Sequence, residues 1–349
     1  MSEILVIKTA ALGDVLRTTS ILPGLMKRHA GARITWLTAP SAVDLVRTHP
    51  LVHEVIALDT KQSADVDVCR IKLATRRYER VISLDDEAPL CRLASAMNSQ
   101  RLHGAFAKPD GTLAYTPDTA PWFEMGLLSV HGKKRADELK VENQRSQPEI
   151  YAAMLGIDFG KPALHLPAPS TEKASAFAAK HALDTSVPLV GLNTGAGGRW
   201  LSKQLPVERT IALAKLVERA LEGRVRFLVL GGDAEGERND AIHRGIGARA
   251  IDGGTKNSLF DFAVLVELCD VLVTSDSLAL HMAIARDVRC VAFFAPTSAA
   301  EIELYELGEK VVSTASDYCS YKADADNSSI TPERLRDAVL RQLALAKTG

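Results

Sequence analysis

Residues 4–14 read ILVIKTAALGD, an apolar run followed by a short turn that ends in glycine and aspartate. The run predicts a buried strand over residues 4–8, and the pattern after it predicts a helix over residues 14–29. The same order recurs along the first half of the sequence. Further strands are expected at 33–37, 55–58, 80–84 and 101–104, with helices at 41–48, 64–78 and 88–98. This alternation is typical of a parallel sheet covered by helices.

A stretch with three prolines, over residues 160–171, interrupts the alternation. The pattern then restarts. Strands are expected at 188–192, 226–230, 249–251, 271–274 and 289–294, with helices at 207–221, 235–245, 258–268 and 276–286. Prolines followed by a restarted pattern indicate a domain boundary. We therefore expect an α/β fold with two Rossmann-like domains, residues 1–165 and 171–330, that face a central cleft.

Two further segments stand apart from the alternation. Residues 106–145 lack periodicity and are rich in polar and turn-forming residues, so we expect an irregular loop on the acceptor side. Residues 331–349 predict a final helix, with Thr331 as its N-cap and Pro332 at its first position. Its apolar residues fall on one stripe, which must pack against another part of the protein.

The composition excludes several classes of function. The chain has 349 residues and a formal net charge of −1, so the broad basic surface of a nucleic-acid-binding protein is not expected. No apolar run has the length of a membrane-spanning helix, and the N-terminus lacks the pattern of an export signal. We expect a cytoplasmic protein. The five cysteines include no Cys-x-x-Cys pair, which argues against a zinc site or a disulfide framework.

The turn after the first predicted strand ends in Asp14. As a general base, this carboxylate would remove the proton of an acceptor hydroxyl. As a helix cap, it would only satisfy the free amides of its own helix. Lys8, at the end of the strand, would bind an anionic acceptor or remain a solvated lysine. The residues alone leave both pairs of alternatives open.

The first turn of the second domain, residues 193–203, reads NTGAGGRWLSK. Its glycines allow backbone amides to approach phosphates, and Lys203 supplies charge for a leaving diphosphate. An ordinary glycine-rich turn is the alternative. The segment lacks the Gly-Lys-Ser/Thr spacing of a phosphate-binding loop for phosphoryl transfer.

Two more turns are expected at the same edge of the second sheet. Glu235 follows a pair of glycines and suits ribose hydroxyls, although helix capping explains it almost equally well. Asp276 and Ser277 precede a helix whose first amides form an anion site, and Ser277 and His281 can add donors. A histidine that is only packed or solvated is the alternative. Together with Lys203, these residues are expected to surround one nucleotide diphosphate. No metal and no cofactor are expected, because the sequence has no convincing cluster of carboxylates.

The sequence resembles the lipopolysaccharide heptosyltransferases of glycosyltransferase family 9, which have the two-Rossmann GT-B architecture. The resemblance rests on residues 7–15 (IKTAALGDV), 203–206 (KQLP), 276–281 (DSLALH) and 294–297 (FAPT). It implies an inverting glycosyltransferase in which Asp14 is the base. Lys8 and Gly13, in the segment that carries Asp14, are expected to bind the acceptor. It implies that Lys203, Glu235, Asp276, Ser277 and His281 surround the donor phosphates and sugar. Donor binding is also expected of Thr194, Gly195, Gly197 and Leu278, which lie in the same turns. It further implies that the final helix returns to the first domain.

The resemblance also implies the substrates. The donor would be a nucleotide sugar, with ADP-heptose as the first choice, and the acceptor a cell-envelope saccharide, free or linked to lipid. A lipid-linked acceptor would allow peripheral contact with the inner membrane face. The sequence departs from well-known members where Asp-Ser-Leu replaces Asp-Thr-Gly at 276–278 and Lys-Gln-Leu-Pro replaces Lys-x-Trp-Pro at 203–206. A different donor, a nucleotide-sugar epimerase and a non-catalytic two-lobed binding protein are the alternatives.

Overall fold

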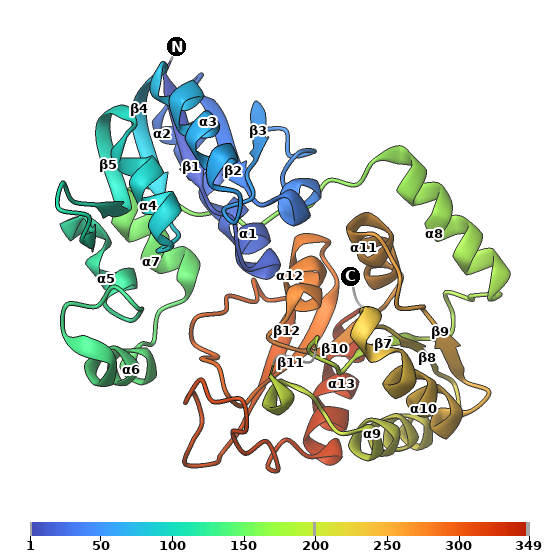
Figure 1. The fold of residues 1–349 in the computed structure, drawn as a ribbon. Coiled ribbons are helices and arrows are strands. Elements are labelled where there is room, and N and C mark those ends of the chain that lie inside the picture. The colour runs from blue at the N-terminus through green and yellow to red at the C-terminus, as the bar shows by residue number, and fades with distance from the viewer. Residues whose placement is uncertain (1, 198–199, 347–349) are drawn as a thin grey trace. The chain divides into compact units, whose positions relative to one another are not determined.

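The computed structural model describes residues 2–197 and 200–346 of the chain (Figure 1). The chain divides into two compact units, Met1–His165 and Leu166–Gly349. Each unit has its own sheet and its own apolar core, as the two runs of alternating elements predicted. In the described part of the chain, no helix is both long and apolar enough to cross a membrane.

The first unit is built on a six-stranded sheet with the order β3-β2-β1-β4-β5-β6. Its strands are β1 (Glu3–Ile7), β2 (Arg33–Thr38), β3 (Glu54–Ala57), β4 (Arg77–Ser83), β5 (Asn98–Ala107) and β6 (Leu113–Tyr115). β1 to β5 are parallel, whereas β6 runs antiparallel to β5. The carboxyl ends of the parallel strands therefore lie at one edge of the sheet, where open α/β sheets bind ligands.

Helices cover this first sheet. They are α1 (Leu12–Thr18), α2 (Leu22–Arg28), α3 (Ser63–Ala74), α4 (Ala88–Ser95), α5 (Ala120–Phe123), α6 (Gly132–Glu142) and α7 (Gln147–Leu155), with short 3-10 turns η1 (Thr19–Ile21), η2 (Pro40–Leu45) and η3 (Pro117–Thr119). α3 and α4 cover one face of this sheet (Figure 1), and their apolar residues belong to one core cluster with residues of β1 and β4. The helix expected over 14–29 is divided into α1, η1 and α2. Pro23 lies in the first turn of α2, where its missing N–H costs no helical hydrogen bond.

The segment 106–145 is more ordered than the sequence suggested. It holds β6, α5 and α6, so the prediction of an irregular loop was wrong. α6 buries only Ala136, and its charged side chains pair along the helix, Lys133 with Asp137 and Arg135 with Glu142. Because its order comes from these pairs rather than from an apolar stripe, hydrophobic periodicity could not reveal it.

The second unit has a parallel six-stranded sheet with the order β12-β11-β10-β7-β8-β9. Its strands are β7 (Leu189–Asn193), β8 (Arg226–Val229), β9 (Ala250–Asp252), β10 (Val271–Ser275), β11 (Arg289–Phe294) and β12 (Gly308–Val312). Its helices are α8 (Ala168–Lys180), α9 (Val207–Ala220), α10 (Gly236–Ile246), α11 (Leu259–Glu267), α12 (Leu278–Ala285) and α13 (Pro332–Ala346), with 3-10 turns η4 (Leu201–Lys203) and η5 (Asp233–Glu235). Successive strand residues point to opposite faces, so α11 and α12 share one core cluster and α9 and α13 share the other.

The final helix α13 packs on the sheet of its own unit. Its buried residues Leu335, Val339 and Leu343 join the cluster that contains Val291 and Phe293 of β11. The expectation that this helix returns to the first domain is therefore wrong. An apolar stripe requires a partner surface but does not specify which sheet provides it. Here α9 and α13 lie side by side on one face of the second sheet (Figure 1).

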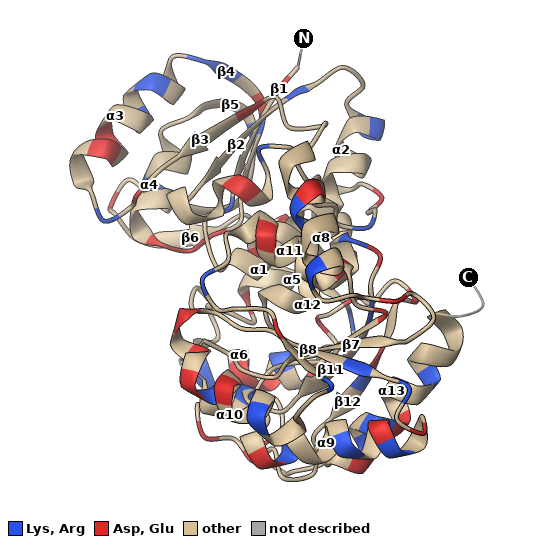
Figure 2. Cartoon of the chain, turned by 90° about the vertical axis from the view of Figure 1, so that its right-hand side faces the viewer, with Lys and Arg blue, Asp and Glu red and all other residues tan. Residues whose placement is uncertain are grey.

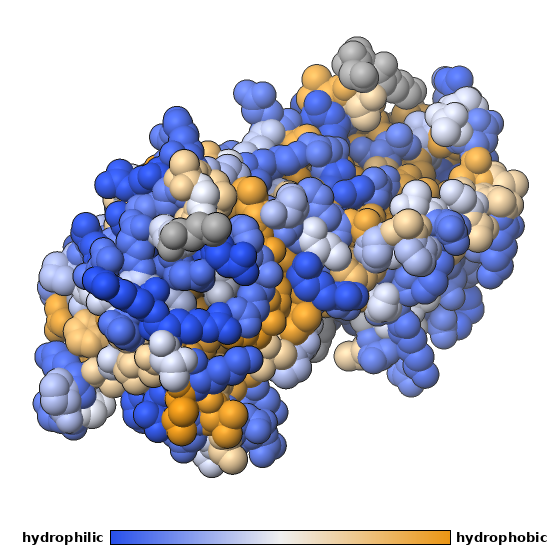
Figure 3. Space-filling model, turned by 90° about the horizontal axis from the view of Figure 1, so that it is seen from above, coloured by the Kyte–Doolittle hydropathy of each residue, from blue (hydrophilic) through white to orange (hydrophobic). Residues whose placement is uncertain are grey.

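The surface is mainly polar. Both signs of charge lie along α9 in Figure 2, opposite the apolar residues that it buries. Hydrophilic residues also cover most of the face shown in Figure 3, where apolar side chains reach the surface in smaller groups. This distribution is ordinary for a globular protein.

We expect the first unit to lose stability in mild acid because His49 is buried as a neutral ring. Its Nδ1 accepts a hydrogen bond from the Leu51 N–H (3.2 Å), and burial, reinforced by the nearby His165, lowers the pKa of His49 from 6.5 to about 4. Between these two values the unfolded chain binds a proton that the folded chain excludes. The free energy of unfolding should therefore fall by roughly 1–3 kcal/mol as the pH drops from 6.5 to 4.

Urea unfolding over this pH range, compared with the variant His49→Asn, measures the effect. The asparagine can accept the same backbone hydrogen bond but does not titrate, so its stability should depend less on pH. Parallel pH profiles of the two proteins would contradict this assignment.

Candidate active site

In the first unit, Asp14 lies in the first turn of α1, directly beyond the carboxyl end of β1. Its carboxylate accepts a hydrogen bond from the Ala11 N–H (3.3 Å) and pairs with Arg17 Nη2 (2.7 Å). The side chain is nevertheless 36% exposed. Asp14 thus caps its helix, and solvent still reaches its carboxylate. A capping role and a proton-accepting role are compatible in this geometry, so Asp14 as the base stays a prediction.

Lys8 is not a solvated lysine. Its buried ammonium pairs with Asp85, whose other oxygen accepts hydrogen bonds from the N–H and hydroxyl of Thr9. Burial alone would lower the pKa of Lys8, but the carboxylates of Asp85 and Asp14 outweigh this effect and raise it. Lys8 therefore carries a fixed positive charge beneath the turn that leads to Asp14. Its contact with an acceptor stays a prediction, as does that of the buried Gly13.

Asp85, which pairs with Lys8, was not among the residues predicted from the sequence. It follows β4, the neighbour of β1, so it lies at the same edge of the sheet as the Lys8–Asp14 turn. The signal was available, because a carboxylate directly after a buried parallel strand lies where ligands bind in this kind of sheet. By holding both Lys8 and Thr9, it fixes the start of the turn that carries Asp14.

In the second unit, Glu235 organises the glycine-rich turn. Its buried carboxylate accepts hydrogen bonds from the N–H of Gly197 (3.1 Å) and of Gly232 (2.8 Å). It therefore joins the turn after β7 to the turn after β8. The structure shows this linking role directly, whereas contact with a ribose stays a prediction. Gly198 and Arg199, which complete the glycine-rich motif, lie outside the described residues.

The carboxylate of Glu235 explains why residue 195 has to be a glycine. A Cβ at this position would lie 1.7 Å from Oε1 of Glu235, and the carboxylate cannot move away without leaving its amide donors. We expect Gly195→Ala to destabilise the protein by about 1–3 kcal/mol, the usual cost of an unsatisfied buried polar group.

Thermal unfolding tests this expectation, with Gly236→Ala as the matched control. Gly236 is the neighbour of Glu235, has a helical backbone, and has no atom within 4 Å of an added Cβ. An equal melting temperature for both variants would show that Glu235 does not hold the turn rigidly.

Arg238 closes the base of the loop between residues 194 and 205. Its Nη2 donates to the carbonyl (2.9 Å) and hydroxyl (2.8 Å) of Thr194 and to the carbonyl of Leu205. The Leu205 N–H also donates to the Thr194 carbonyl (3.0 Å). Thr194 is therefore one of the residues that hold the two ends of this loop together. The sequence carried no signal for Arg238, because a single arginine on α10 looks like any solvated helix residue.

Lys203, Asp276 and His281 gather at the carboxyl edge of the second sheet. Lys203 Nζ lies 2.9 Å from the Asp276 carbonyl and 3.0 Å from its carboxylate, and 5.6 Å from the centre of the Trp200 ring. His281 Nε2 lies 3.8 Å from the same carboxylate and is almost fully buried. The sequence placed these three residues in one site, and the structure brings them together.

Ser277 and Leu278 lie at the start of α12 in the same place. Ser277 is the N-cap, and its hydroxyl lies 2.9 Å from that of Thr274 at the end of β10. Leu278 is the first residue of the helix. The α12 amides and the Lys203 ammonium therefore lie close to one another, an arrangement that can hold an anion.

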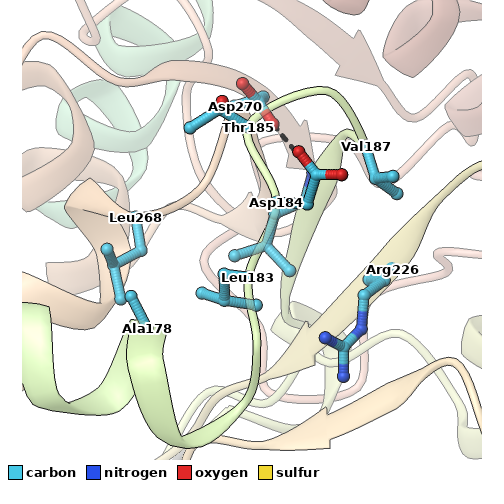
Figure 4. Close-up of a pocket in the computed structure, with 9 residues that line it drawn as sticks. Ala178, Leu183, Asp184, Thr185, Val187, Arg226, Leu268 and Asp270 are labelled. Atoms are coloured by element: carbon cyan, nitrogen blue, oxygen red, sulfur yellow. Dashed lines mark hydrogen bonds between the residues drawn. The ribbon is translucent and has the colours of Figure 1, made fainter.

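A separate cavity of about 170 Å³ lies near the start of β7 and β8 (Figure 4). Leu183, Val187 and Leu268 form its apolar wall, and Arg226 lies at its rim. It is at the amino edge of the sheet, opposite the turns described above, and is not part of the candidate site. No group of three or more His, Cys, Asp or Glu side chains in residues 2–197 and 200–346 is arranged to hold a metal ion.

Comparisons with known proteins agree with this fold. The family model described as glycosyltransferase family 9 (heptosyltransferase) matches residues 115–331. A comparison with curated proteins finds no match. Among solved structures, the chain is similar to a family 9 glycosyltransferase from Veillonella parvula, with a TM-score of 0.80, 21% identity and coverage of 98% of this chain and 97% of the other.

Two enzymes of E. coli also have similar structures. ADP-heptose lipopolysaccharide heptosyltransferase II gives a TM-score of 0.67 at 18% identity, with 99% of this chain and 100% of the other covered. The heptosyltransferase WaaC, in a structure with ADP, gives 0.62 at 17% identity, with 98% and 99% covered. At these identities the likeness shows the fold, which is GT-B as expected.

Proposed function

Because the chain belongs to glycosyltransferase family 9, it is a glycosyltransferase, and we propose that it transfers heptose from ADP-heptose to a cell-envelope saccharide. The observation that carries the proposal is the grouping of Lys203, Asp276 and His281 beside the first turn of α12. This group suits the diphosphate of a nucleotide sugar. The acceptor would be a saccharide such as the lipopolysaccharide core, and if it is lipid-linked the enzyme would work at the inner membrane face.

The names of similar proteins support the choice of donor. One is an ADP-heptose lipopolysaccharide heptosyltransferase, and WaaC has been solved with ADP and with ADP-2-deoxy-2-fluoro heptose. In the present chain the glycine-rich turn, anchored by Glu235 and Arg238, would bring backbone amides to the phosphates. Thr194, Gly195, Gly197, Ser277 and Leu278 would complete the donor site.

The proposed reaction is a single displacement with inversion. The acceptor hydroxyl would attack the anomeric carbon of the sugar while Asp14 takes its proton. The bond from the anomeric carbon to the phosphate oxygen would break, and ADP would leave with the electron pair. Lys203 and the α12 amides would stabilise the negative charge that grows on the departing diphosphate. No metal ion takes part in this proposal.

Calorimetric titration of the full chain with ADP, UDP, GDP and CDP tests the donor. We expect ADP to bind most tightly, because a pocket that hydrogen-bonds adenine would reject a base that leaves its polar groups unpaired. Tighter binding of UDP or GDP would rule out ADP-heptose as the donor but would not affect the assignment as a glycosyltransferase. Incubation with ADP-heptose alone excludes the epimerase alternative if the sugar stays unchanged. Transfer to an acceptor saccharide excludes a purely binding role.

A further inference from the structure

We propose that Trp122 is the platform on which the acceptor sugar stacks, next to the Asp14–Arg17 pair in the first unit. This inference rests on the proposed function, since it names the place of the saccharide that supplies the attacking hydroxyl. Arg17 connects the two elements: its Nη2 lies 2.7 Å from Asp14 Oδ1, and its Cζ lies 6.0 Å from the centre of the Trp122 ring. An indole, a guanidinium and a carboxylate therefore occupy neighbouring positions.

These three groups together match the surface of a sugar ring. A pyranose has an apolar C–H face, which an aromatic ring can cover, and hydroxyls around its rim. The Asp14 carboxylate can accept a hydrogen bond from one hydroxyl, and the Arg17 guanidinium can donate to its neighbour. A sugar stacked on Trp122 would thus present a hydroxyl to the carboxylate proposed as the base. The class of ligand that this arrangement recognises is a saccharide ring with adjacent hydroxyls.

The indole is partly exposed, but its position is fixed from behind. Tyr151 of α7 is fully buried, and its ring meets that of Trp122 edge to face at a centroid distance of 5.0 Å. Burial raises the pKa of Tyr151 to about 12, so the ring stays a neutral phenol beside the indole. The next residue, Phe123, is buried and stacks on Tyr115 of β6 at 5.8 Å. Tyr151 therefore supports Trp122 from behind, Arg17 lies over its ring, and part of the indole remains exposed.

A buried polar chain fixes the turn that leads to Trp122. Asp118, in η3, lies 2.6 Å from His103 Nδ1, and Arg80 Nη1 lies 2.8 Å from His103 Nε2. Because arginine can only donate, Nε2 must accept, and the neutral imidazole donates its Nδ1 proton to Asp118. Burial lowers the pKa of His103, which favours the same neutral form. The sheet thus holds η3, and η3 sets the start of α5. Rigid support of this kind is what a binding residue requires.

Steady-state kinetics of Trp122→Ala and Trp122→Phe test the proposal, with ADP-heptose as donor and a heptose-free inner-core lipopolysaccharide oligosaccharide as acceptor. We expect Trp122→Ala to raise the KM for the oligosaccharide about ten-fold or more and to leave the KM for ADP-heptose within two-fold. Trp122→Phe should recover most of the loss, since it keeps an aromatic face. Leu127→Ala, at a 90% exposed apolar side chain a few residues further on, should match the wild type.

Calorimetry with the oligosaccharide alone and with ADP alone gives a readout independent of turnover. Trp122→Ala should bind ADP like the wild type and the oligosaccharide more weakly. An unchanged KM for the oligosaccharide, or an equal rise in both KM values with a lower melting temperature, would overturn the proposal. If the wild type neither binds ADP nor transfers heptose, the proposed function itself fails. If it does both and Trp122→Ala keeps the acceptor KM, only the inference about Trp122 fails.

Discussion

Asp14→Asn should slow sugar transfer by about two to four orders of magnitude while leaving ADP affinity within a few-fold, which is the usual effect of losing a positioned general base. The carboxylate lies beyond the carboxyl end of β1, solvent reaches it, and Arg17 orients it at 2.7 Å. Asparagine has nearly the same shape and can still accept the hydrogen bond of the Ala11 N–H. It cannot take a proton from the acceptor hydroxyl. Single-turnover rates with saturating ADP-heptose measure the loss.

The variant also breaks an ion pair, and a control must separate this effect from catalysis. Asp44→Asn provides it: Asp44 pairs with Arg47 three residues later, at 2.5 Å, and its side chain is 37% exposed, as against 36% for Asp14. Asp44→Asn should change the melting temperature little, because its pair is exposed, and Asp14→Asn should lower it more, because its partner Arg17 is only 12% exposed. Only Asp14→Asn should lose transfer. A single-turnover rate close to that of the wild type would leave Asp14 as a helix cap alone.

The residues at the carboxyl edges of the sheets could be predicted from the sequence. Once apolar runs identify parallel strands, the residue after each strand must lie at one edge, whatever the order of the strands. Lys203, Asp276 and His281 come from segments more than 70 residues apart, yet the order β10-β7-β8 brings their turns together. The sequence was sufficient to identify these strands, because burial on both faces makes each of them a continuous apolar run.

Other features were out of reach of the sequence for physical reasons. Arg238 acts through long-range hydrogen bonds to the carbonyls of Thr194 and Leu205, and no local pattern indicates such partners. β12 was missed because it lies at the edge of the sheet and buries only Val311. α13 was assigned to the wrong domain because an apolar stripe does not specify which sheet it packs on. In each case the feature depends on a contact between segments that are far apart in the sequence, and the pattern of one segment cannot reveal such a contact.

The second large effect is expected from Lys203→Ala. This variant should weaken ADP binding about ten-fold and slow transfer by about two to three orders of magnitude, since a fixed cation stabilises the charge that develops as the diphosphate leaves. Calorimetry and single-turnover rates measure the two losses separately. Lys173→Ala is the matched control: Lys173 also pairs with an aspartate, Asp261 at 2.8 Å in the same unit, but its side chain is 65% exposed. It should behave like the wild type.

The loss in Lys203→Ala has two components, because Lys203 also neutralises Asp276. Without the ammonium, the Asp276 carboxylate would repel the phosphates at close range. In the double variant Lys203→Ala/Asp276→Asn that repulsion is absent. This variant should therefore bind ADP at least as tightly as Lys203→Ala alone, and the two changes should not be additive.

His281 Nε2 lies 3.8 Å from the same carboxylate, and His281→Ala should show a smaller loss of ADP affinity and transfer rate. Unchanged ADP affinity and transfer rate in both Lys203→Ala and His281→Ala would show that the diphosphate does not bind at this edge of the sheet. The chain would remain a glycosyltransferase, but its donor would have to bind elsewhere.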